Sequence, residues 1–208
     1  MSDEARRVTN PAPSAPASGV LRTAVRLEWA TVAWNVCEVF VTLGLGIAAR
    51  SLALLAFGLD SVVEIFASAV VLWQLRGKRE GGFRTRRALR LVSFAFFTLA
   101  AILIAGAAQG LVSERHADDS LPGIIYLAIT SAVMFTLAWR KRVVSAAVGS
   151  HPLEHEARIT FLDGVLAAGI MLALAANAAF GWWWADALAA LAVGLAAIPE
   201  GLAAPREH

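Results

Sequence analysis

The sequence contains a single cysteine, Cys37, and a single tyrosine in 208 residues. One cysteine excludes a disulfide framework within the chain. The sequence also lacks the H-E-x-x-H, G-x-S-x-G and P-loop patterns, which are typical of metalloproteases, α/β-hydrolases and phosphate-binding enzymes. Nothing in the sequence therefore supports hydrolysis, and we expect a protein that is not an enzyme.

The N-terminal segment lacks the features of a signal peptide. Residues 1–20 are rich in Ser, Ala and Pro and contain no apolar core of signal-peptide type. We interpret them as a disordered cytoplasmic tail, because such a composition buries too little apolar surface to fold. Residues 204–208 are expected to form a short C-terminal tail, which leaves residues 21–203 for a folded transmembrane domain.

Charged residues are scarce within six long apolar segments. The chain is 58% hydrophobic and has a mean hydropathy of +0.64, whereas about half of the residues in a soluble domain are apolar. Each segment holds about 20 residues, the length that a helix needs to cross about 30 Å of hydrocarbon. The segments are Leu27–Ala49, Ser51–Leu75, Leu89–Val112, Leu121–Trp139, Ile159–Phe180 and Trp184–Leu202. The sequence therefore predicts an all-α, polytopic membrane protein with six transmembrane helices.

Lys and Arg are distributed unevenly between the two sides of these spans. Of the 18 Lys and Arg residues, all but Arg50 and Arg115 lie in or beside the N-terminal segment, the second connection, the fourth connection or the C-terminal tail. This bias predicts that both termini are cytoplasmic. The basic second connection also suits nucleic acid, but it lies between two spans, and we expect no nucleic-acid partner. On the opposite side, Trp182, Trp183 and Trp184 are typical of the aromatic belt at the lipid headgroups.

The second apolar segment carries two acids, Asp60 and Glu64, and no Lys or Arg between Ser51 and Leu75. Because they are four residues apart, their side chains project from the same face of a helix about one turn apart. On insertion scales, a charged group in hydrocarbon costs roughly 2.5 kcal/mol or more. We therefore expect the pair to face a cavity that holds water or cations, and not lipid.

Acids also occur in the fifth and first segments. Asp163 lies early in the fifth segment, and Thr160 and Glu156 precede it by three and seven residues, so that all three share one helical face. We interpret them as a row of oxygen ligands, while Glu156 also fits a solvated residue at the helix start. Glu38 lies in the middle of the first segment, one turn from Asn35. It is either a protonated, structurally satisfied side chain or a part of an ion pathway.

The remaining polar and small residues are expected to serve packing. Gly164 and Gly169 in the fifth segment permit close backbone approach by another helix. The third and fourth segments hold no acid or base in their interior, and we interpret them as scaffold or as an oligomer surface. Asp186, at the start of the sixth segment, is expected to cap its own helix.

The chemistry of the acids points to cations. Asp60, Glu64 and Asp163 offer carboxylate oxygens, which suit divalent cations such as Zn²⁺, Mn²⁺, Fe²⁺ or Co²⁺. Carboxylates that crowd together in a medium of low dielectric constant also favour their neutral forms. Such groups take up protons when the metal leaves and release them when it returns. Combined with alternating access to the two faces of the membrane, this would exchange metal for protons.

Two runs carry a resemblance to a known family, namely Leu52–Glu64 with its acid pair and Trp182–Leu188. With six spans, cytoplasmic termini and an aspartate early in the fifth span, the chain resembles the cation diffusion facilitator family. The resemblance implies a tetrahedral divalent-metal site on the second and fifth helices, with Asp60, Glu64 and Asp163 as ligands. It implies a metal exporter, with zinc as the first candidate and iron, manganese, cobalt or cadmium as alternatives.

Two features depart from the family pattern. The position four before Asp163, where the family has a ligand, is Ile159, so the fourth ligand would come from Thr160, Glu156, Glu38 or water. Family members commonly add a cytoplasmic metal-binding domain, and this chain looks like a transmembrane-only form. The resemblance implies a homodimer formed through the helices, and the Ala- and Arg-rich composition suggests a bacterial inner membrane.

Three interpretations stay open from the sequence: a proton-coupled exporter, a passive cation channel, and a non-transporting membrane scaffold whose protonated acids fix helix packing. One estimate opposes a shared site. Counted by helical rise from the outer ends of the spans, Asp163 lies about 26 Å deep and Glu64 about 20 Å deep. If that offset is real, Asp163 guards the cytoplasmic entrance and does not join the pair.

Overall fold

The computed structural model describes residues 18–76, 82–148 and 151–203, and all regular secondary structure in these ranges is helical. The helices are α1 (Ser18–Ala49), α2 (Leu52–Arg76), α3 (Gly82–Val112), α4 (Leu121–Val148), α5 (His151–Phe180) and α6 (Trp184–Ala203). All except α2 contain a described stretch long and apolar enough to cross a membrane. α2 has 25 residues, or about 37 Å of helix, and its side chains after Phe66 lie outside the described residues. The prediction of an all-α, polytopic protein is confirmed.

The predicted tails are only partly covered by the structure. α1 begins at Ser18, so residues 18–20, which the sequence assigned to the N-terminal tail, are helical. Residues 1–17 and 204–208, the rest of the two predicted tails, lie outside the described residues. The assignment of residues 1–17 as disordered therefore stays a prediction.

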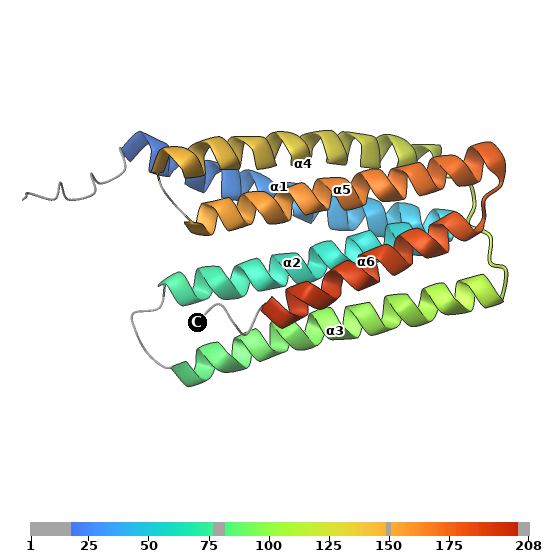
Figure 1. Ribbon diagram of the computed structural model, residues 1–208, viewed down its shortest axis with the longest axis horizontal. Helices are drawn as coiled ribbons and strands as arrows, with labels where there is room; N and C mark the ends of the chain where they lie inside the picture. Colours follow the sequence, from blue (N-terminus) through green and yellow to red (C-terminus); the bar gives the residue numbers. More distant parts are fainter. Residues whose placement is uncertain (1–17, 77–81, 149–150, 204–208) are drawn as a thin grey trace, which may run out of the picture.

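The helices run up and down beside one another in an elongated bundle (Figure 1). α4 lies along α5, α3 lies along α6, and α1 lies along α2. α2 joins these pairs, because it also contacts α3, α5 and α6. The helix with the acid pair therefore has neighbours on several sides, and its polar face meets other helices.

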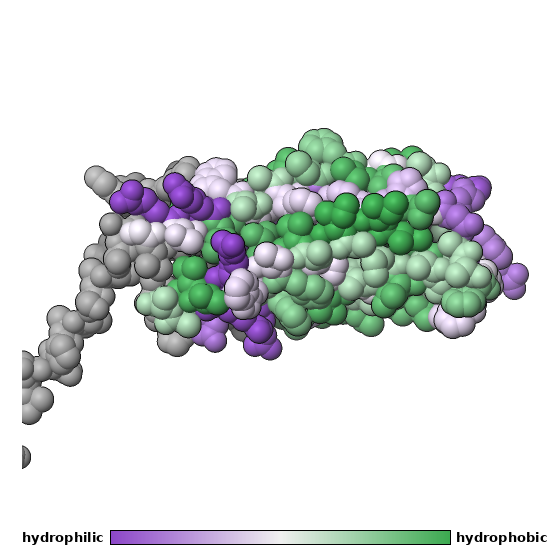
Figure 2. Space-filling model, turned by 90° about the horizontal axis from the view of Figure 1, so that it is seen from above, coloured by the Kyte–Doolittle hydropathy of each residue, from purple (hydrophilic) through white to green (hydrophobic). Residues whose placement is uncertain are grey.

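Apolar side chains occupy both the interior and the outer surface of the bundle. Large apolar side chains that are fully buried include Leu54, Phe57, Leu103, Leu127, Ile170 and Leu174. Others are exposed, among them Phe40, Ile47, Phe94 and Leu172. Figure 2 shows hydrophobic residues along the middle of the molecule and hydrophilic residues gathered toward its two ends. A soluble monomer rarely exposes so much contiguous apolar surface, whereas lipid would cover it. The protein is therefore an integral, multi-pass membrane protein.

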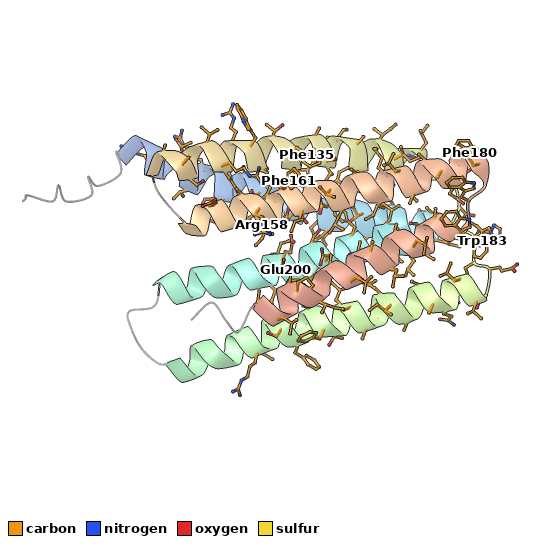
Figure 3. The ribbon with its side chains drawn as sticks, in the orientation of Figure 1. Phe135, Arg158, Phe161, Phe180, Trp183 and Glu200 are labelled. Atoms are coloured by element: carbon orange, nitrogen blue, oxygen red, sulfur yellow. The ribbon has the colours of Figure 1, made fainter. Side chains whose placement is uncertain are left out.

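Aromatic side chains gather at the end that carries the α5–α6 connection, where Figure 3 labels Phe180 and Trp183. The rings of Trp182 and Trp184 stack with centroids 5.3 Å apart. His116, in the α3–α4 connection, stacks on Trp183 at 5.5 Å. This arrangement matches the aromatic belt expected at the headgroup level.

Candidate metal centre

Asp60 and Glu64 of α2 and Asp163 of α5 come together inside the bundle. Each offers a carboxylate oxygen, and these three oxygens lie within 4.8 Å of one another. Asp60 and Asp163 are buried, and Glu64 is partly buried. We call these residues the acidic trio. Around a tetrahedral metal with bonds of about 2.0–2.2 Å, ligand oxygens lie roughly 3.4 Å apart, so side-chain movements of about 1 Å would bring the trio to ligand distance.

α1 contributes polar groups that face the same part of α2. The Asn35 side-chain N–H donates to Glu64 Oε2 at 3.2 Å. About one turn further along α1, Glu38 Oε1 accepts a hydrogen bond of 2.5 Å from the Ser61 hydroxyl. Glu38 is almost completely buried, and it does not belong to the acidic trio. The sequence considered it as a ligand, and the structure shows it as a neighbour whose one oxygen is held by Ser61.

A glycine permits α1 to lie this close to α2. A Cβ atom on Gly58 would lie 2.6 Å from Thr42 Oγ1 and 2.9 Å from Leu43 Cδ2, so even alanine would require these side chains or the helices to shift. Gly58 is two residues before Asp60. The close approach at Gly58 therefore fixes α1 against the stretch of α2 that carries the acid pair.

α4 positions the stretch of α5 that carries Asp163. The Ser131 hydroxyl donates to the Gly164 carbonyl at 2.9 Å, and a Cβ on Gly164 would lie 2.9 Å from the Phe135 ring. Close approach therefore occurs at Gly164. At Gly169 a Cβ would have nothing within 4 Å among the described residues, so no such approach occurs there.

A buried lysine lies between α4, α1 and α5. The Lys141 side chain is completely buried, and its ammonium group donates to Glu28 Oε2 and to Thr160 Oγ1, each at 3.1 Å. Lys141 lies beyond Trp139, the end of the predicted fourth span, so its burial is a feature that the sequence did not predict. The sequence grouped Lys141 with the cytoplasmic charges, but its spacing of seven and three residues from the buried Met134 and Ala138 places it on the same helical face.

The other expected ligands do not join the trio. The Thr160 hydroxyl faces Lys141, so the structure gives this oxygen a structural contact where the sequence suggested a ligand. Ile159 is partly buried and has no ligand atom. The side chain of Glu156 lies outside the described residues, as does that of His155.

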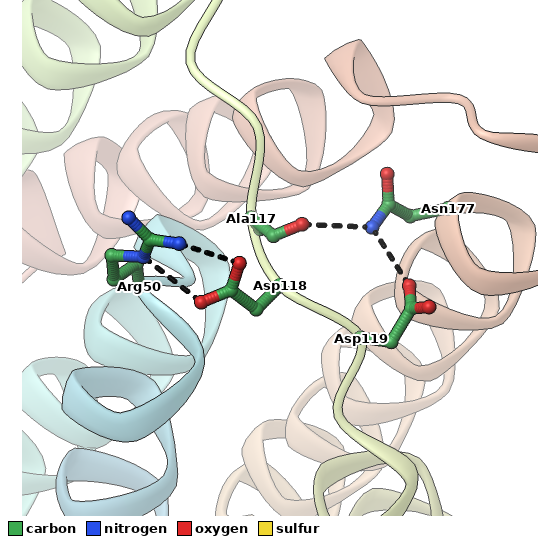
Figure 4. A network of polar contacts seen from close by, with 5 residues as sticks. All are labelled: Arg50, Ala117, Asp118, Asp119 and Asn177. Atoms are coloured by element: carbon green, nitrogen blue, oxygen red, sulfur yellow. Dashed lines mark hydrogen bonds and ion pairs between the residues drawn. The ribbon is translucent and has the colours of Figure 1, made fainter.

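A polar network ties the α1–α2 turn and the α3–α4 connection to α5 at the end opposite the basic connections (Figure 4). Arg50 donates twice to Asp118, at 2.9 and 2.7 Å. The Asn177 amide donates to the Ala117 carbonyl at 3.1 Å and to Asp119 at 3.5 Å. The hydrogen bonds from Arg50 lower the pKa of Asp118, and the same pairing raises the pKa of Arg50. Both side chains are solvent-exposed, so the pair contributes little to stability.

This network explains why Asp163 lies at a depth in the bundle similar to that of Glu64. Asn177 of α5 bonds Ala117, and the next loop residue donates its N–H to the Ala49 carbonyl at 2.8 Å. Asn177, and not the end of α5, is therefore level with the end of α1. By helical rise, Asp163 lies about 21 Å below Asn177, and Glu64 lies about 18 Å below the start of α2. Counting α5 from its terminus therefore enlarged the offset between the two acids from about 3 Å to the roughly 6 Å expected from the sequence.

Asp186 caps a helix other than its own. Its carboxylate accepts hydrogen bonds from the Ser51 hydroxyl at 2.5 Å, from the Leu52 N–H at 2.8 Å and from the Ala53 N–H at 3.4 Å. These groups form the start of α2, and the Ser51 hydroxyl oxygen accepts from the Leu54 N–H at 3.1 Å. The expectation that Asp186 caps α6 is therefore corrected, because its oxygens satisfy the N-terminal donors of α2.

Comparison with known proteins agrees with this architecture. A family model described as the cation efflux transmembrane domain matches residues 29–207. The chain belongs to the cation diffusion facilitator family. A Synechocystis protein named as an uncharacterized transporter is 28% identical over 179 residues, which cover 80% of this chain. The chain spans 58% of the length of that relative.

Proposed function

We propose that this cation diffusion facilitator exports a divalent metal ion, with zinc as the first candidate, in exchange for protons. The observation that carries the proposal is the acidic trio, three carboxylate oxygens of α2 and α5 within 4.8 Å of one another. Family membership supports transport of a cation, and the Synechocystis relative is itself named as a transporter. Iron, manganese, cobalt and cadmium are the alternative metals, because carboxylate oxygens accept each of them.

The exchange of metal for protons follows from the charges of the trio. Three carboxylates this close repel one another strongly in a medium of low dielectric constant. A dication relieves the repulsion by binding all three, and protons relieve it when the dication leaves. Metal and protons therefore occupy the trio in turn, and alternating access to the two sides of the membrane converts this competition into antiport.

The cellular setting of the proposal rests on the sequence. The composition and the cyanobacterial relative favour a bacterial inner membrane, and the Lys and Arg bias favours cytoplasmic termini. The homodimer implied by the resemblance also stays a prediction.

The proposal is tested with the purified chain in liposomes that contain a fluorescent zinc indicator. An imposed proton gradient should drive zinc across the membrane, and Asp60→Asn and Asp163→Asn should abolish this movement, because each keeps the side-chain shape and removes a charge. Asp119→Asn is the matched control, since Asp119 is exposed and lies in the α3–α4 connection. Zinc movement that ignores the proton gradient would favour a channel, and the absence of any movement by the parent chain would favour a scaffold.

A further inference from the structure

The acidic trio supplies three oxygens, and a tetrahedral metal requires a fourth. Ile159 has no ligand atom, and the Thr160 hydroxyl contacts Lys141. One oxygen of Glu38 is held by Ser61. Among the side chains of α1 that hydrogen-bond to α2, two offer a further oxygen that is buried and makes no hydrogen bond to any described residue, namely Asn35 Oδ1 and Glu38 Oε2.

Of these two groups, Asn35 is the one that is hydrogen-bonded to a residue of the trio, whereas Glu38 is bonded to Ser61. The Asn35 side-chain N–H donates to Glu64 Oε2 at 3.2 Å, so the amide lies directly against a trio carboxylate. Asn35 is only 6% exposed. Its Oδ1 atom is buried and makes no hydrogen bond to any described residue. A buried acceptor without a partner is unfavourable by about 1–3 kcal/mol, and a ligand that needs an oxygen donor would relieve this penalty.

We infer that Asn35 supplies the fourth oxygen, so that α1 completes the metal site beside Asp60, Glu64 and Asp163. This inference rests on the proposed function and names a ligand for the same site. Rotation about the Cβ–Cγ bond exchanges the two ends of the amide and turns Oδ1 toward the trio. The rotation breaks no hydrogen bond of Oδ1, and the metal replaces the bond between Asn35 and Glu64 by bonding to both. Amide and carboxylate oxygens together form an all-oxygen donor set for a dication.

The register of the two helices supports this role. Glu38 of α1 meets Ser61 of α2, and Asn35 meets Glu64, so the antiparallel helices present Asn35 one turn nearer to the basic end than Glu38. The close contact at Gly58 holds this register. Asn35 is therefore held at the level of Glu64 by packing, and only its amide has to turn.

The test compares two roles of Asn35, as a metal ligand and as a hydrogen-bond donor to Glu64. Zinc affinity is measured by titration calorimetry on the full chain in detergent for the parent, Asn35→Ala and Asn35→Asp. As a ligand, Asn35→Ala weakens binding by roughly 10–100-fold or more, whereas Asn35→Asp retains parental affinity because it keeps an oxygen in place. As a donor only, Asn35→Asp loses affinity as Asn35→Ala does, since a carboxylate beside Glu64 cannot donate, and this result overturns the inference.

A spectroscopic readout makes the test independent of affinity and of folding of the alanine variant. Co²⁺ replaces zinc as the probe, and Asn35→His substitutes a nitrogen donor for the oxygen, so the Co²⁺ absorption spectrum should shift if position 35 binds the metal. An unchanged spectrum, or loss of affinity in Glu38→Gln equal to that in Asn35→Ala, overturns the inference. Ser145→Ala is the control, because it removes a buried hydroxyl of α4 that donates to the Arg142 carbonyl of its own helix. A parent chain that binds no metal refutes the proposed function itself, whereas a parent that binds while the position-35 variants bind equally well refutes only the role of Asn35.

Discussion

Replacing Asp186 with alanine removes the group through which α6 holds the start of α2. The carboxylate accepts from the Leu52 N–H at 2.8 Å, from the Ser51 hydroxyl at 2.5 Å and, more weakly, from the Ala53 N–H at 3.4 Å. Asp186 is buried, so water would not freely take its place in the variant. The substitution therefore leaves donors at the α2 terminus without acceptors and removes a contact between two distant parts of the chain.

The expected loss of stability follows from these contacts. Removing an N-cap costs about 0.5–2 kcal/mol, and each buried donor left unsatisfied costs about 1–3 kcal/mol. The Leu52 N–H counts fully and the other two donors count partly, which gives a total of about 2–4 kcal/mol for Asp186→Ala. Asp186→Asn keeps one acceptor oxygen and should cost about 1 kcal/mol.

Thermal unfolding of the detergent-solubilised chain, followed by circular dichroism, measures this effect. At about 2–4 °C per kcal/mol for a chain of this size, Asp186→Ala should lower the unfolding midpoint by about 4–16 °C. Asp119→Ala is the control, since it removes an exposed carboxylate at the same end of the molecule and should change stability by no more than about 0.5 kcal/mol. Equal midpoints for Asp186→Ala and the parent would refute the account of Asp186 as the cap of α2.

Two further predictions use other contacts of the bundle. Lys141→Met keeps the length of the side chain but removes the buried ammonium group and both of its hydrogen bonds. This variant should lower the free energy of unfolding by about 1–3 kcal/mol, and an unchanged thermal midpoint would contradict this expectation. Asp118→Asn tests the exposed pair with Arg50, whose hydrogen bonds lower the pKa of Asp118. The stability from a carboxylate with a lowered pKa is present above its ordinary titration range and is lost as the pH falls through its folded pKa. The midpoint of the parent should therefore show a small, salt-sensitive decrease in acid that Asp118→Asn lacks, and identical pH profiles would count against the pair.

The spans and the acids of the site were readable from the sequence because they depend on local properties. The length of an apolar run decides whether it can cross a membrane, and the periodicity of a helix decides that Asp60 and Glu64 share a face. An acid within such a run is unusual enough to be noticed without knowledge of its neighbours, as with Asp163. The six helices and the acids that meet in the trio were therefore predicted.

Only the tertiary structure decided which helices are neighbours and how deep in the bundle each of their residues lies. The sequence placed Asp163 about 5 Å too deep because it could not show that Asn177, and not the end of α5, is level with the turn between α1 and α2. It assigned Asp186 to its own helix and Lys141 to the cytoplasmic charges, since a donor and an acceptor more than a hundred residues apart leave no local pattern. For the same reason, only the structure shows that the Asn35 amide donates to Glu64 of α2. Helical periodicity fixes which residues share a face, but the depth and rotation of each helix are set by packing against its neighbours.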